Sequence, residues 1–128
     1  MKVIQELVAY FERRGRLSPN EVRKLLDQGL LAGEAPPNMI NLCDQIGATY
    51  YFRVTGDTNG AVWGTDIYTG DSSLGTAAVH AGLAKPGESV VVKVTVERPL
   101  NQYQGTSRNG VTSREFGQYG TAYRLARV

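Results

Sequence analysis

Residues 63–82 read WGTDIYTGDSSLGTAAVHAG, and this segment sets the architecture expected for the chain. Asp71 or Ser72 can cap the start of a helix here, and Gly82 can close it. The residues in between are small around most of the helix circumference: Gly75, Thr76, Ala77, Ala78 and Ala81. A helix without a broad polar face is usually buried, and small side chains let strands approach its backbone. The segment therefore predicts a short central helix enclosed by β-strands.

Strands are predicted on both sides of this helix. The clearest covers residues 90–97, whose alternate positions are all valine: Val90, Val92, Val94 and Val96. Residues 48–54 are aromatic and β-prone, and the turn that follows predicts a hairpin with residues 61–63. Asn109-Gly110 predicts another tight turn, and residues 122–125 predict a closing strand. One short helix among several strands indicates an α+β fold.

Two sequence elements resemble the LCCL domain family. The family signature runs roughly as Tyr-x-x-x-Ser-Ser-x-Cys-x-Ala-Ala-x-His-Ala-Gly, and its places are filled by Tyr68, Ser72, Ser73, Ala77, Ala78, His80, Ala81 and Gly82. A second element, Tyr-x-Gly followed by Asn-Gly-Ile/Val-x-Ser, is matched by Tyr103, Gly105, Asn109, Gly110, Val111 and Ser113. The resemblance covers about residues 42–126. It implies a central helix wrapped by two antiparallel β-sheets and a binding role, with lipopolysaccharide or polysaccharide suggested as ligand for some members. It implies no general catalytic activity.

The chain departs from the resemblance in its cysteines. Extracellular LCCL members carry four cysteines in two disulfides, whereas Gly75 replaces the helix cysteine here and Cys43 is the single cysteine. Each missing disulfide would remove roughly 2–4 kcal/mol of stabilisation if nothing replaced it. This pattern fits a reducing compartment, and the N-terminus lacks a signal peptide. We therefore expect a cytoplasmic, bacterial protein if the chain is full length.

The N-terminal residues 1–34 are predicted to form a two-helix hairpin ahead of an LCCL-like domain at residues 38–128. Its first helix carries an apolar stripe at helical spacing, formed by Ile4, Leu7, Val8 and Phe11. Pro36 and Pro37 predict an extended linker after it. Because the hairpin has too few residues to bury a core alone, its stripe is predicted to be an interaction face. That face would drive homo-oligomerisation or dock on the rest of the chain.

Composition limits the classes of partner. The net charge of +2 makes nucleic acid an improbable ligand, and no apolar run approaches the roughly 20 residues that span a bilayer. His80 is the sole histidine, and its place on a buried helix predicts a hydrogen bond in the core rather than a catalytic or metal-binding role. The sequence predicts no metal site and no cofactor, because no ligand set with metal-binding spacing, P-loop or GxGxxG pattern is present.

Polar and aromatic residues around the second LCCL element offer candidate ligand contacts. Aromatic faces beside amides and arginines suit a sugar or a peptide backbone. The residues selected on this ground are Trp63, Tyr103, Arg108, Asn109 and Arg114. An ordinary polar loop is the competing interpretation, and Trp63 is either a core anchor or a ligand platform.

The leading hypothesis is a non-enzymatic binding or assembly module that contacts a protein partner or another copy of itself. The alternative is a carbohydrate- or lipopolysaccharide-binding module, by analogy with secreted relatives. A hydrolase ranks lower, because the sequence shows no nucleophile–base pair.

Overall fold

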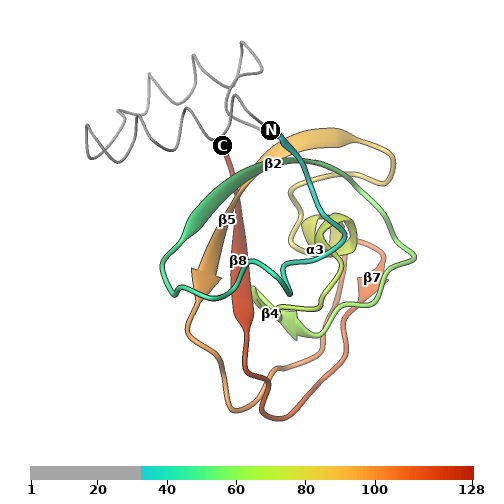
Figure 1. Cartoon of the computed structure of the whole chain (residues 1–128). Helices are drawn as coiled ribbons and strands as arrows, with labels where there is room; N and C mark the ends of the chain where they lie inside the picture. The colour runs from blue at the N-terminus through green and yellow to red at the C-terminus, as the bar shows by residue number, and fades with distance from the viewer. Residues whose placement is uncertain (1–32) are drawn as a thin grey trace, which may run out of the picture.

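The computed structural model describes residues 33–128, which form a mostly β structure with one short helix (Figure 1). The helix is α3 (Leu74–His80). The strands are β1 (Gly33–Glu34), β2 (Thr49–Thr55), β3 (Gly64–Thr65), β4 (Ile67–Thr69), β5 (Ser89–Glu97), β6 (Ser107–Arg108), β7 (Val111–Thr112) and β8 (Ala122–Arg127). The predicted α+β class is confirmed.

Six of the strands form one sheet in the order β1-β2-β5-β8-β4-β3. β1 runs parallel to β2, and every other neighbouring pair in this sheet is antiparallel. β6 and β7 form a separate antiparallel pair. The prediction of two antiparallel sheets is therefore wrong for the larger one, which is mixed because β1 joins its edge in parallel.

The helix α3 lies between the main sheet and the β6–β7 hairpin, and contacts β2 and β7 (Figure 1). All of its residues except Gly75 are buried. The sheet meets the helix with the predicted valine face of β5, where no valine of the alternating set is more than 8% exposed. The central, small-residue helix predicted from residues 63–82 is confirmed.

The ends of the helix differ in part from expectation. Ser73, not Asp71 or Ser72, is the N-cap, and its hydroxyl accepts a hydrogen bond from the Thr76 N–H at 3.3 Å. The hydroxyl of Ser72 lies instead 2.9 Å from that of Thr69, so it supports the preceding loop. Gly82 follows the C-cap with φ of +80°, as a closing glycine should.

The predicted hairpin between residues 48–54 and 61–63 is wrong. β2 pairs with β5 and β1, because the valine face of β5 gives it a long apolar ladder. The turn residues bond to the helix segment rather than across a hairpin: the Gly60 N–H donates to Thr76 Oγ1 at 3.0 Å, and the Ser73 N–H donates to the Ala61 carbonyl at 2.9 Å. The strands predicted at 90–97 and 122–125 and the Asn109-Gly110 turn are confirmed.

Most of the predicted N-terminal hairpin, with its interaction face of Ile4, Leu7, Val8 and Phe11, lies outside the described residues and stays a prediction. Gly33 and Glu34, which were assigned to that extension, form β1 beside Phe52 and Arg53. Within residues 33–128, no helix is both long enough and apolar enough to cross a membrane.

The close approach of α3 to β2 generates a stability prediction. A Cβ added at Gly75 would lie 2.6 Å from the carbonyl oxygen of Thr55, so helix and strand would have to move apart. We expect Gly75→Ala to lower the free energy of unfolding by about 1–3 kcal/mol, although alanine favours a helix over glycine by about 1 kcal/mol. Urea denaturation measures this effect. Gly117→Ala is the matched control, because no atom lies within 4 Å of its added Cβ. Unchanged or increased stability of Gly75→Ala would contradict the close contact.

Candidate binding surface

A chain of buried hydrogen bonds holds the β6–β7 hairpin on the helix. His80 is fully buried at the end of α3, and its Nδ1 lies 2.9 Å from the Tyr68 hydroxyl. Its Nε2 lies 3.1 Å from the carbonyl oxygen of Thr106, just before β6. A carbonyl can only accept, so Nε2 donates to it, and in the neutral imidazole Nδ1 then accepts from the Tyr68 hydroxyl. Both ring nitrogens are therefore occupied within the core, as the structural interpretation of His80 requires.

Two further contacts fix the hairpin in place. Asn109 lies at the β6–β7 turn with φ of 55°, followed by Gly110 with φ of 81°, as a tight hairpin turn demands. The Asn109 side-chain amide donates to the carbonyl oxygen of His80 at 3.0 Å, satisfying a group that the helix end leaves open. Thr65 Oγ1 lies 2.7 Å from Thr106 Oγ1, which joins β3 to the same loop. The hairpin is thus held from two sides.

Trp63 and Arg114 come together on the outside of this frame. They form an isolated parallel β-bridge, with Gly64 N–H donating to the Arg114 carbonyl at 3.0 Å. The guanidinium carbon of Arg114 lies 6.0 Å from the centroid of the Trp63 ring, a cation–π distance. Trp63 is half-buried and Arg114 is exposed, so the pair faces solvent. Trp63 therefore serves neither as a fully buried anchor nor as a free platform.

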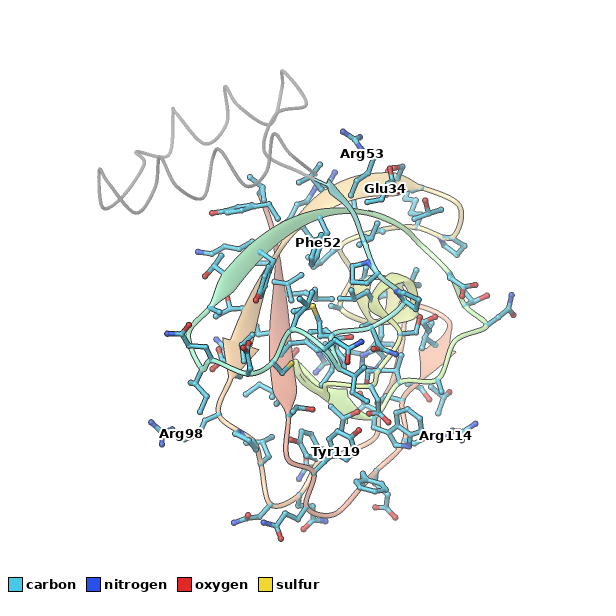
Figure 2. The ribbon with its side chains drawn as sticks, viewed as in Figure 1. Glu34, Phe52, Arg53, Arg98, Arg114 and Tyr119 are labelled. Atoms are coloured by element: carbon cyan, nitrogen blue, oxygen red, sulfur yellow. The ribbon has the colours of Figure 1, made fainter. Side chains whose placement is uncertain are left out.

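Phe116 continues this surface two residues along the chain. It is 44% exposed, and its ring makes an edge contact with Tyr119 at a centroid distance of 5.8 Å. Arg114 and Tyr119 lie at the same end of the molecule, away from Arg53 (Figure 2). We call the group formed by Trp63, Arg114, Phe116 and Tyr119 the aromatic surface. Phe116 was missed from the sequence, although its alternation with Arg114 after the Asn-Gly turn was a usable signal.

Tyr103 lies beneath the aromatic surface, and its selection as a ligand contact is wrong. Its side chain is fully buried, because its hydroxyl accepts the Leu100 N–H at 3.0 Å and donates to the Tyr119 carbonyl at 3.1 Å. Its backbone also pairs with Phe116. Tyr103 therefore positions the loop that carries Phe116 and Tyr119, and its ring is not available to a ligand.

The other two predicted contacts have structural partners. Arg108 is exposed, and its Nη1 lies 2.9 Å from Asp66 Oδ1 at the β3–β4 turn. Asn109 is committed to His80 through its side-chain amide. The structure therefore brings Trp63 and Arg114 together, places the Arg108–Asp66 pair on the adjoining hairpins, and removes Tyr103 from the set.

The buried groups give no support to the hydrolase hypothesis. His80 bonds Tyr68 and Thr106, not Ser72, Ser73 or Cys43. Burial, followed by the charge of Asp44, raises the pKa of the Cys43 thiol, which disfavours the nucleophilic thiolate. In residues 33–128, no three or more His, Cys, Asp or Glu side chains converge as metal ligands would.

The part of the chain that contains the helix and the β6–β7 hairpin matches a known domain family. The family model for the LCCL domain matches residues 40–122. The chain belongs to the LCCL domain family. The helix, the His80 network and the β6–β7 hairpin all fall inside the matched part, whereas the predicted N-terminal hairpin lies outside it.

Three proteins similar to this LCCL chain are known by name. The transcriptional regulatory protein rxt3 of Schizosaccharomyces pombe is 37% identical over 73 residues, which cover 52% of this chain and 21% of that protein. Clotting factor C of Tachypleus tridentatus and Limulus clotting factor C of Carcinoscorpius rotundicauda are each 37% identical over 68 residues, covering 53% of this chain and 7% of theirs. The LCCL chain therefore matches about a fifth or less of each relative's length.

The Tyr68–His80 bond generates a prediction at alkaline pH. Burial raises the pKa of Tyr68 from 10.0 to about 12, so the unfolded chain loses this proton first. The protonated Tyr68 hydroxyl contributes to the free energy of unfolding in full below pH 10. This contribution, roughly 2–3 kcal/mol, is lost between pH 10 and about 12. Urea denaturation of the wild type and Tyr68→Phe at successive pH values measures the difference. Tyr68→Phe should lose less stability across this range, whereas an equal loss in both proteins would refute the assignment.

Proposed function

We propose that this LCCL-family chain is a non-enzymatic protein-binding module that contacts peptide segments of its partner through the aromatic surface. The observation that carries the proposal is the exposed Phe116 ring, which lies beside Tyr119 and two residues after Arg114, the partner of Trp63. Tryptophan, tyrosine and arginine are the residues most enriched among the strong contacts of protein interfaces. A surface of these residues can therefore supply strong contacts to a partner protein.

The frame under the aromatic surface supports this proposal. Backbone hydrogen bonds join Arg114 to Val62 and Gly64, the two neighbours of Trp63, and join Phe116 to Tyr103. Tyr103 is buried and bonded to the backbone of Tyr119. The backbone that carries these side chains is thus held in position before binding, which lowers the entropy cost of association.

The relatives support a contact role in a different way. One is named for transcriptional regulation and the others for clotting, two processes that share no chemical reaction. A domain found in both is more simply explained as a contact module than as a catalyst. Carbohydrate or lipopolysaccharide remains the alternative ligand class, because aromatic rings beside arginine also suit sugars.

The test is selection from a random-peptide display library on the immobilised full chain. We expect the wild type to enrich binding peptides, and Arg114→Ala and Phe116→Ala each to weaken them at least tenfold, about 1.4 kcal/mol. Both side chains are substantially exposed, so the variants should fold. Arg98→Ala is the matched control, because Arg98 is exposed on the opposite side of the same view (Figure 2).

A glycan and lipopolysaccharide panel is run with the same proteins. Peptide binding that is insensitive to both substitutions, or no enrichment at all, would refute the proposal. Glycan binding that is lost in Arg114→Ala and kept in Arg98→Ala would support the alternative ligand class instead.

A further inference from the structure

The aromatic surface has a hydrogen-bonding character that narrows its ligand. The indole N–H of Trp63 has no acceptor among residues 33–128, and its nitrogen is not among the buried atoms that lack a partner, so it reaches solvent. The Arg114 guanidinium forms no ion pair within the same part of the chain. The surface thus offers unused N–H donors beside an exposed aromatic ring.

Charged acceptors are scarce on this surface. Asp66 is paired with Arg108 at 2.9 Å. Asp71, which hydrogen-bonds to the Tyr119 side chain, has its Oδ1 buried. Glu115 alternates with Arg114 and Phe116 along an extended chain, so its side chain is directed to the other side. Sugar hydroxyl groups both donate and accept hydrogen bonds. Their O–H donors would find few acceptors on this surface. Because Arg108 is paired with Asp66, Arg114 is the single unpaired cation among these residues. One positive charge attracts a phosphorylated or strongly acidic ligand only weakly.

The backbone at the aromatic surface is also already paired. The Arg114 N–H donates to the Val62 carbonyl at 2.8 Å, and the Phe116 N–H donates to the Tyr103 carbonyl at 3.0 Å. A peptide that binds by adding a strand needs unpaired backbone groups at an edge. The ligand must therefore be recognised by side chains, through its own rings and carbonyl groups.

From these features we infer that the aromatic surface takes a proline-rich segment in the polyproline II conformation. Proline supplies a carbonyl acceptor and no N–H donor, which complements a surface of donors where Asp66 is paired and the free oxygen of Asp71 is buried. A polyproline II segment makes no internal hydrogen bonds, so its carbonyls are open to Trp63 and Arg114, while its rings pack on Phe116. This inference rests on the proposed function and names the partner class for it.

Tryptophan fluorescence can measure binding at this surface. Trp63 is the one tryptophan in the chain, so its fluorescence reports binding at this surface when the added peptide contains none. The probes are synthetic proline-rich peptides. The controls are peptides of equal length and charge in which alanine replaces proline. We expect the wild-type full chain to bind the proline-rich set at least tenfold more tightly than the alanine set.

Substitutions separate donor recognition from packing. Trp63→Phe keeps an aromatic ring but removes the N–H, and Arg114→Leu removes the guanidinium. Each should weaken proline-rich peptides about fivefold or more, measured by calorimetry where the tryptophan is absent. Arg98→Leu, the matched control, should leave affinity unchanged, and circular dichroism verifies folding of each variant.

The outcomes keep the two proposals distinct. Proline-dependent binding that Arg114→Leu weakens and Arg98→Leu spares supports the inference. If selected peptides without proline bind at the aromatic surface and the proline-rich set does not, the protein-binding proposal stands and the inference is overturned. If neither peptide class binds, both are overturned.

Discussion

The contact between the backbones of α3 and β2 governs the rest of the structure. At Gly75 the helix approaches so closely that a Cβ would meet the Thr55 carbonyl at 2.6 Å. The Asp57 N–H also donates to the Gly75 carbonyl at 3.2 Å, which ties the end of β2 to the helix. Ala77 and Ala78, both fully buried, keep the helix slender enough to lie under the sheet. The sheet can therefore close over one side of the helix and leave its other side to the β6–β7 hairpin.

His80 joins the end of the helix to the elements that surround it. Its ring joins β4 through Tyr68 and the loop before β6 through Thr106, and its carbonyl receives Asn109. Each of these groups is buried or partly buried, so a lost bond would leave a donor or acceptor unsatisfied at a cost of about 1–3 kcal/mol. The helix, β4 and the β6–β7 hairpin are thus one hydrogen-bonded unit. This explains why the family signature joins a helix histidine to a distant Asn-Gly turn.

The confirmed predictions rest on periodicity within one segment, and the wrong prediction for β2 concerns pairing between distant segments. The alternating valines of β5 and the small-residue helix follow from patterns within one segment. The partner of β2 could not be predicted, because the valine face that attracts it lies some forty positions along the chain. Tyr103 was misplaced because a tyrosine serves equally as a buried hydrogen-bonding ring or a surface contact. Phe116 is exposed against the usual expectation for its type, so its alternation with Arg114 was the signal in the sequence that pointed to its exposure.

The close approach at Gly75 also explains how this member manages without the disulfides of its extracellular relatives. A cysteine at this position would place its Cβ 2.6 Å from the Thr55 carbonyl oxygen, so restoring the LCCL signature cysteine would force the helix and β2 apart. The remaining cysteine, Cys43, is partly buried, and its raised pKa keeps the thiol protonated, so it packs as a small apolar group. The bonds that hold the β6–β7 hairpin on the helix involve an amide, a hydroxyl, backbone carbonyls and an imidazole, none of which is a thiol.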